Sequence, residues 1–218
     1  MVFLLELLLP GACGGCGRAG SIWCAECHAG LRPASRSDER FLRANPGVAV
    51  GERLDVAVAA LAYEGRLRHA LARLKYGAMP RLARPLADAA VPLLRPLLDD
   101  VPAGTLVPVP VHQDRMRDRG YNQATLLARE LARRVGHPVD ELLVRQRPTE
   151  KQHRLNRAAR LRNLRNAFAV RDGIDRVPVE IVLVDDILTT SATLEACAAV
   201  LRDAGAQRVV GVAIAREL

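Results

Sequence analysis

Two adjacent acids followed by hydroxyl residues lie in the stretch VLVDDILTTSAT, residues 182–193. Asp185 and Asp186 end an apolar run typical of a buried parallel strand, and ILTTSAT leads into the next helix. Backbone N–H groups at a helix start, with Thr and Ser hydroxyls beside them, form a phosphate-sized anion site. The acids would accept hydrogen bonds from a neutral diol or hold a divalent ion, as a sugar phosphate requires. The alternative is a solvated acid pair before an ordinary N-cap.

Four of the five cysteines lie in CGGCGRAGSIWCAEC, in a C-x2-C-x7-C-x2-C pattern. Two C-x-x-C pairs can present four thiolates to one tetrahedral ion, and the glycines beside the first pair let the backbone fold closely around the sulfurs. Two disulfides are the alternative, which a cytosolic chain disfavours. The pattern predicts a closed structural zinc site with the ligands Cys13, Cys16, Cys24 and Cys27.

The chain is basic, with 32 Lys and Arg against 24 Asp and Glu and a net charge of +8. This balance points to anionic partners, although codon bias in a GC-rich genome explains an overall arginine excess equally well. Residues 145–171 hold eight arginines and Lys151 against one acid, so this stretch alone has a net charge of +8. A solvated helix is the alternative, because Leu161, Leu164 and Phe168 have helical spacing. The residues predicted to contact an anion or DNA are Arg154, Arg157, Arg160 and Arg162.

Strands alternating with helices are expected to position these groups. We predict strands at 55–63, 105–111, 181–186 and 208–215, and helices at 65–77, 79–98, 124–136 and 193–205. Prolines should break the 79–98 segment into one or two helices, and the prolines of the 105–111 strand should lie near a sheet edge or at a strand end. A basic loop is expected at 112–123. The order predicts an α/β fold, a parallel sheet flanked by helices, whose ligands bind at the carboxyl ends of the strands.

Three parts are predicted along the chain: a zinc-binding four-cysteine module at 1–35, a polar linker at 36–54 and an α/β domain at 55–218. The start, MVFLLELLLPGAC, carries Glu6 inside its apolar run. It is shorter than the roughly 20 residues that span a bilayer, so we expect a short helix ended by Pro10 and Gly11. The expected location is cytoplasmic, without membrane insertion, and a homo-oligomer is left open.

VLVDDILTTSAT resembles the phosphoribosyl pyrophosphate (PRPP) signature of type I phosphoribosyltransferases. Other segments narrow the resemblance to the ComF family, also called the GntX family, of competence-associated proteins. The paired cysteines, YEGRLRHALARLKYG, LVPVPVHQDRMRDRGYNQA and QHRLNRAARLRNLRNAFAV resemble segments of that family in the same order. The resemblance extends over nearly the whole chain and implies that 55–218 is a type I phosphoribosyltransferase-like domain.

The resemblance also implies roles for individual residues. Asp185 and Asp186 would be catalytic and contact the ribose 2′ and 3′ hydroxyls, directly or through Mg²⁺. The cradle of the 5-phosphate would consist of Thr189, Thr190, Ser191, Ala192 and Thr193. By analogy with the fold, the loop after the 105–111 strand would meet the pyrophosphate, with a solvated loop as the alternative. The candidates in that loop are Arg115, Arg117 and Arg119, and Lys75, in LKYG, is a further candidate for phosphate contact.

Ser191 is where this chain departs from the family signature, which usually has Gly at that position. A left-handed or closely approached backbone would cost Ser about 1 kcal/mol relative to Gly.

Two functions stay open. In the first, the chain binds Mg²⁺ and PRPP and transfers a phosphoribosyl group with release of pyrophosphate, in association with natural competence. In the second, it is a non-catalytic factor that binds single-stranded DNA, or a nucleotide, during DNA uptake alongside a competence helicase. With seven aromatic residues in the chain, DNA contact would be mainly electrostatic. The sequence does not identify an acceptor substrate.

Overall fold

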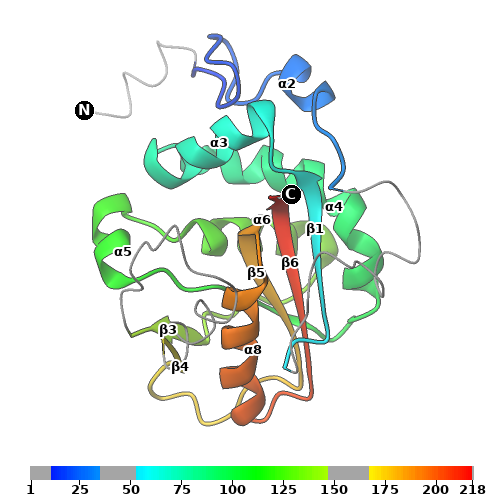
Figure 1. Cartoon of the computed structure of the whole chain (residues 1–218), viewed down its shortest axis with the longest axis vertical. Coiled ribbons are helices and arrows are strands. Elements are labelled where there is room, and N and C mark those ends of the chain that lie inside the picture. Colours follow the sequence, from blue (N-terminus) through cyan, green and yellow to red (C-terminus); the bar gives the residue numbers. More distant parts are fainter. Residues whose placement is uncertain (1–10, 35–52, 147–166, 218) are drawn as a thin grey trace.

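The computed structural model describes residues 11–34, 53–146 and 167–217. A parallel sheet of four strands, in the order β1–β6–β5–β2, forms the centre of this part of the chain (Figure 1). The strands are β1 (Val56–Ala62), β2 (Thr105–Pro108), β5 (Glu180–Leu188) and β6 (Arg208–Arg216). β2 lies at one edge of the sheet, beside β5. This agrees with the prediction from its prolines, because an edge strand tolerates a missing N–H donor.

Helices cover both faces of the sheet (Figure 1). Side chains alternate along each strand, so Val182 and Val210 point into one apolar core and Leu183 and Val209 into another. The first core is completed by α3 (Gly65–Tyr76), α4 (Ala83–Asp99) and α6 (Gln123–Val135), and the second by α8 (Ala192–Asp203). The predicted fold class, a parallel sheet flanked by helices, is confirmed.

The prediction that prolines break the 79–98 segment is wrong. After a short 3-10 turn, η2 (Pro80–Leu82), helix α4 continues through Pro92 and Pro96. Both prolines are exposed, so water can reach the carbonyls whose partner N–H is missing. The opposite side of α4 buries Leu86, Leu94 and Leu98 completely. Burial of that side outweighs the cost of the prolines.

Residues 112–123, predicted as a loop, contain a helix, α5 (Gln113–Arg119). His112 Nδ1 accepts a hydrogen bond from the Asp114 N–H at 3.3 Å, and Gly120, with φ 76°, ends the helix. None of the α5 residues is buried. The helix therefore has no apolar periodicity by which the sequence could have predicted it.

An antiparallel pair, β3 (Leu143–Arg145) and β4 (Phe168–Val170), was not predicted. Phe168 lies in β4, so its assignment to a helix is wrong, while Leu161 and Leu164 lie outside the described residues. α8 ends at Asp203, two residues before the predicted Gly205.

The N-terminal module contains α2 (Ala25–Ala29) and lies against α3, near the carboxyl ends of the strands (Figure 1). Its last described residues run beside β1: the Ala62 N–H donates to Arg32 O at 2.8 Å and the Ala34 N–H to Ala60 O at 2.9 Å. The predicted domain boundaries at 35 and 54 stay predictions, because most of the linker between them lies outside the described residues, as does the helix expected at 1–10. Within the described ranges, no helix has the length and apolar character needed to cross a membrane.

Candidate functional site

A cavity of about 470 Å³ opens where the strands end. Residues that follow β1, β2, β5 and β6 all contribute to its wall, as expected for a parallel sheet. Seven of the predicted site residues line it, namely Lys75, Arg115, Arg119, Asp185, Asp186, Thr189 and Thr193. Together they bring a carboxylate pair, hydroxyl groups and basic side chains to one hollow.

The two acids lie within β5 rather than at its end. β5 continues to Leu188, which pairs with Arg216 of β6, so the prediction that the strand stops at the acids is wrong. Asp186 is 3% exposed, and its Oδ2 lies 2.8 Å from the Lys75 Nζ. Asp185 is partly buried, and its Oδ1 accepts a hydrogen bond from the Asp186 N–H at 2.8 Å.

Asp185 and Asp186 differ in charge, because only Asp186 pairs with Lys75. Burial, together with the Asp186 carboxylate, raises the pKa of Asp185 to about 8. Burial of Lys75 opposes its charged form, but the carboxylates of Asp186 and Asp185 outweigh this effect and raise the pKa of Lys75. The ligand-free site therefore contains an ion pair, Lys75 with Asp186, beside a carboxyl group that resists ionisation.

The hydroxyl loop after the acids turns through Ser191, which caps α8 with a left-handed backbone of φ 56°. Thr189 and Thr193 line the cavity. Ser191 and Ala192 are buried, and the Ser191 Oγ donates to Thr190 O at 2.6 Å. The structure thus places Ser191 in the conformation that favours glycine.

Replacing Ser191 by glycine tests this strain. We expect Ser191→Gly to be about 1 kcal/mol more stable to urea than Ser191→Ala, since both lack the hydroxyl but only alanine keeps a Cβ at positive φ. Ala78→Gly is a matched control elsewhere, because Ala78 has φ 49°. Equal stabilities of the Gly and Ala variants at position 191 would show that this backbone carries no such strain.

Only some of the arginines predicted to contact an anion line the cavity. Arg119 lines the cavity, stacks over the Tyr76 ring at 4.7 Å and donates to Gln123 Oε1 at 2.8 Å. Arg117 is not among the lining residues; its side chain is 76% exposed and pairs with Asp114 at 3.7 Å. The basic residues Arg154, Arg157, Arg160 and Arg162 lie outside the described residues.

Arg145 was not singled out in the sequence, although it lines the cavity from β3. Its guanidinium lies 5.4 Å from the centre of the Phe168 ring. Burial, and then the charge of Arg115, lower the pKa of Arg145. Arg145 also lines a smaller neighbouring cavity of about 170 Å³. Its role depends on the pairing of β3 with β4, which the sequence did not indicate.

One wall of the cavity comes from residues that the sequence did not connect with it. Tyr63 follows β1, and the Arg68 guanidinium lies over it, 5.9 Å from the centre of the Tyr63 ring. Glu217 follows β6. Asn122 joins the start of α6 to Val109, which lines the cavity: its Oδ1 accepts from the Ala124 N–H at 3.0 Å and its Nδ2 donates to Val109 O at 2.9 Å. The sequence Asn-Gln-Ala before an apolar period was a detectable N-cap signal.

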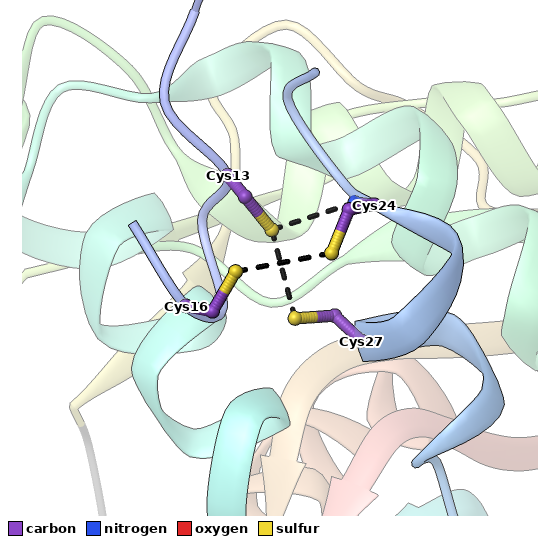
Figure 2. Close-up of side chains that lie close together, drawn as sticks. All are labelled: Cys13, Cys16, Cys24 and Cys27. Atoms are coloured by element: carbon purple, nitrogen blue, oxygen red, sulfur yellow. Dashed lines mark hydrogen bonds between the residues drawn. The ribbon is translucent and has the colours of Figure 1, made fainter. Parts of the chain in front are cut away.

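The four predicted cysteines converge on one point (Figure 2). Their sulfurs lie within 4.8 Å of one another, with Cys13 Sγ 3.6 Å from Cys27 Sγ and Cys16 Sγ 3.8 Å from Cys24 Sγ. A tetrahedral zinc ion with bonds of about 2.3 Å requires sulfurs roughly 3.8 Å apart, whereas a disulfide requires about 2.05 Å. The arrangement therefore fits a closed metal site such as one for zinc and not two disulfides.

The protein backbone prepares this cluster for a cation. Burial of Cys13 favours its thiol, but hydrogen bonds from the backbone of Cys16, Cys24 and Gly15 outweigh it and lower the pKa of Cys13 to about 6. Burial and the neighbouring thiols raise the pKa of Cys27 to about 12. Thiolates are the form that binds metal, so a bound ion would supply the positive charge that favours the thiolate of Cys27 beside that of Cys13.

The metal cluster is joined directly to α3. The Arg73 Nη1 donates to Cys13 O at 2.6 Å, and His69 Nδ1 lies 3.4 Å from Gly15 O. A Cβ on Gly14 would lie 2.5 Å from a methyl group of Leu82, so a larger residue there would require the Leu82 side chain to shift. α3 thus carries contacts to the cysteine loop and, two residues after Arg73, Lys75 in the cavity.

Relatives of this chain are named for competence and DNA use, while no family model matches it. Competence protein F of Haemophilus influenzae is 34% identical over 113 residues, 51% of this chain and 49% of the relative. DNA utilization protein YhgH of Escherichia coli is 39% identical over 108 residues, 48% of this chain and 45% of the relative. Competence protein ComFC of Bacillus subtilis is 36% identical over 100 residues, 46% of this chain and 39% of the relative. The matches thus span about half of this chain and at most half the length of these relatives. They confirm the resemblance to competence-associated proteins over the matched half of the chain.

Two solved structures are similar in part. Glutamine PRPP amidotransferase from Bacillus subtilis, in complex with ADP and GMP, matches with a TM-score of 0.37 and 20% identity over 63% of this chain and 26% of that chain. A structure of the allosteric regulatory enzyme of purine biosynthesis matches with a TM-score of 0.35 and 21% identity over 63% and 25%. Scores this low do not define a fold, which here follows from the strand order itself.

Proposed function

We propose that this chain binds PRPP, as its Mg²⁺ complex, in the cavity at the carboxyl ends of the strands and transfers the phosphoribosyl group to an acceptor. The observation that carries the proposal is the composition of that one cavity. Carboxylates from β5, hydroxyls at the start of α8 and arginines of α5 line the same hollow. These are the groups that a ribose, a phosphate and a diphosphate require.

Each part of PRPP has a matching part of the wall. The 5-phosphate would bind at Thr189 and Thr193, where α8 begins and the helix dipole favours an anion. The ribose hydroxyls would donate to Asp185 and Asp186. The pyrophosphate would lie beside Arg115 and Arg119, on the side of β2, a strand that pairs directly with β5.

The positions of these groups predict from which side an acceptor would come. Displacement at the anomeric carbon breaks the bond to the pyrophosphate oxygen, which keeps the electron pair, and forms a bond from the acceptor on the opposite side. With pyrophosphate on the β2 side, the acceptor would approach from the side of β6 and β1. Tyr63, Arg68 and Glu217 line that wall, and a planar ring with hydrogen-bonding edges is the chemistry they suit.

Electrostatics would supply most of the rate enhancement. The arginines would compensate the charge that develops on the leaving pyrophosphate, and the carboxylates would stabilise the positive ribosyl centre. Mg²⁺, carried by the substrate, would neutralise pyrophosphate oxygens. The proton of the acceptor would pass to solvent.

Calorimetry with PRPP and Mg²⁺ tests the proposal. We expect saturable binding by the wild type and a roughly 100-fold or greater loss of affinity in Asp185→Asn/Asp186→Asn, because charge-assisted hydrogen bonds contribute about 1.5–3 kcal/mol each. Asp140→Asn/Asp172→Asn is the matched control, since both residues are exposed and neither lines the cavity. Equal affinities in the two double variants, or no binding by the wild type, would exclude this site.

A second candidate function is the binding of single-stranded DNA, which the names of the relatives suggest. The observation in its favour is the two Tyr–Arg pairs at the cavity, Tyr63 with Arg68 and Tyr76 with Arg119. Tyr76 is 70% exposed, so a base could stack on it. Affinity for an oligonucleotide should then fall steeply with salt and further in Tyr76→Ala or after charge reversal of Arg157, Arg160 and Arg162. A competence helicase would be a partner in this function.

A further inference from the structure

Lys75 holds the position at the acid pair that a divalent cation would need. Its Nζ lies 2.8 Å from Asp186 Oδ2, and the two side chains are 20% and 4% exposed. Mg²⁺ binds carboxylate oxygens at about 2.0–2.1 Å and keeps several of its waters. An ammonium group and a hydrated Mg²⁺ cannot both occupy the buried space at this oxygen. The acid pair, with Lys75 at this oxygen, therefore does not fit a resident Mg²⁺.

The backbone that carries Lys75 is held in place. The Tyr121 hydroxyl donates to Leu74 O at 2.7 Å, and the Gly77 N–H donates to Arg73 O at 2.8 Å, where α3 ends. Leu74 itself is fully buried. The lysine side chain, in contrast, has four flexible carbons and a compact charge, so its ammonium can move while the helix stays fixed.

The charges around Lys75 pull in opposite directions. Asp186 and Asp185 lie on one side, and Arg115, Arg119 and Arg145 contribute positive charge to the same cavity. In the ligand-free cavity the carboxylate is the partner that favours the ammonium. A polyphosphate beside the arginines would bring several anionic oxygens into the same space and compete with Asp186 for Lys75.

We propose that Lys75 is a built-in counter-ion of the acid pair, which keeps free divalent cations out and admits one only together with a polyphosphate that draws the ammonium away from Asp186. The exclusion stands on the contact between Lys75 and Asp186 alone, whereas admission with a polyphosphate rests on the proposed function. Cation and PRPP would consequently bind as one complex and not in separate steps.

Manganese titrations followed by electron paramagnetic resonance test the exclusion, on the full-length chain loaded with zinc. Without PRPP, the wild type is expected to show no saturable Mn²⁺ site in the millimolar range. Lys75→Met should gain a Mn²⁺ site whose affinity is roughly tenfold or more above that of the wild type, since the positive charge beside the Asp186 carboxylate has been removed. Asp186→Asn in the Lys75→Met background should remove that site, and Lys75→Arg should behave like the wild type because it keeps the charge.

Tight Mn²⁺ binding by the ligand-free wild type would overturn the proposal without any variant, as would a new site in Lys75→Met that survives Asp186→Asn. If Lys75→Met fails to fold, Lys75→Gln replaces it, and a Lys75→Gln protein that is folded but gains no site has the same meaning. With PRPP present, the wild type should bind Mn²⁺. If the wild type binds PRPP but takes up no Mn²⁺ with it, the joint admission is overturned. If the wild type binds no PRPP, the proposed function is removed, while the exclusion is still supported by the titrations without PRPP.

Discussion

Removal of metal from the four-cysteine site is expected to destabilise the chain by several kcal/mol. Structural zinc contributes on the order of 10 kcal/mol to the folding of segments that have almost no core of their own. Metal loss leaves Cys13 and Cys27, both buried, among thiols that have no common cation. Chelation under reducing conditions should therefore lower the melting temperature, and zinc should restore it.

The effect should extend beyond the cysteines. Cys13 O accepts from Arg73, and Gly15 O lies beside His69, so the loop that carries the first two cysteines is joined to two side chains of α3. Hydrogen exchange should accordingly become faster in residues 11–34 and also in 65–76 when the metal is removed. Cys197→Ala is the matched control, because Cys197 is a buried thiol in the α8 core, away from the cluster. If Cys13→Ser destabilises the chain no more than Cys197→Ala does, the cluster is not a structural metal site.

The substitution Asp185→Asn is expected to change stability and ligand affinity in opposite directions. The pKa of Asp185 is raised to about 8 in the folded chain, so the folded state binds a proton more tightly than the unfolded state does. Stability from this group is fully present below its unfolded pKa near 4 and is lost as the pH rises towards 8, by up to about 1.4 kcal/mol per pH unit. Asparagine removes this slope.

Urea denaturation at several pH values between 6 and 8 checks this prediction. Asp185→Asn should be more stable than the wild type throughout, and the difference should grow with pH, while the affinity for PRPP falls. Asp140→Asn, at an exposed position, should leave both the slope and the affinity unchanged. A stability difference that shrinks as the pH rises would contradict a raised pKa at Asp185. Such a loss of stability in exchange for ligand affinity is typical of sites where like charges are held together for binding.

The core of the fold was predictable because it depends on local apolar patterns. All four strands of the sheet were predicted within a few residues, and the long helices followed from their 3.6-residue period. The errors have local physical causes. α4 crosses Pro92 and Pro96 on its exposed side, α5 has no buried side to give it a period, and β5 extends past the acids because β6 continues beside it.

The candidate site was predictable where its residues are adjacent in sequence. Asp185, Asp186 and the threonines form one local pattern, and the four cysteines form another. Tyr63, Arg68 and Glu217 have no such signal. They share a cavity with the acids only because the strand order places β6 beside β5 and β1 beside β6. Lys75 was predicted for a phosphate, yet its observed partner is Asp186. A contact across 111 positions of sequence is outside the reach of pattern analysis.

Both edges of the sheet are covered by short segments that are not strands. Residues 32–34, which follow the metal cluster, hydrogen-bond along β1, and at the other edge the Leu106 N–H donates to Pro138 O at 2.8 Å while the Asp140 N–H donates to Leu106 O at 3.0 Å. Uncovered edge strands pair with other chains and promote aggregation. The segment after the cysteines thus also covers the edge of β1 at which another chain could pair. A chain truncated before Leu54 would expose the apolar strand β1 and should aggregate, even if its cavity were intact.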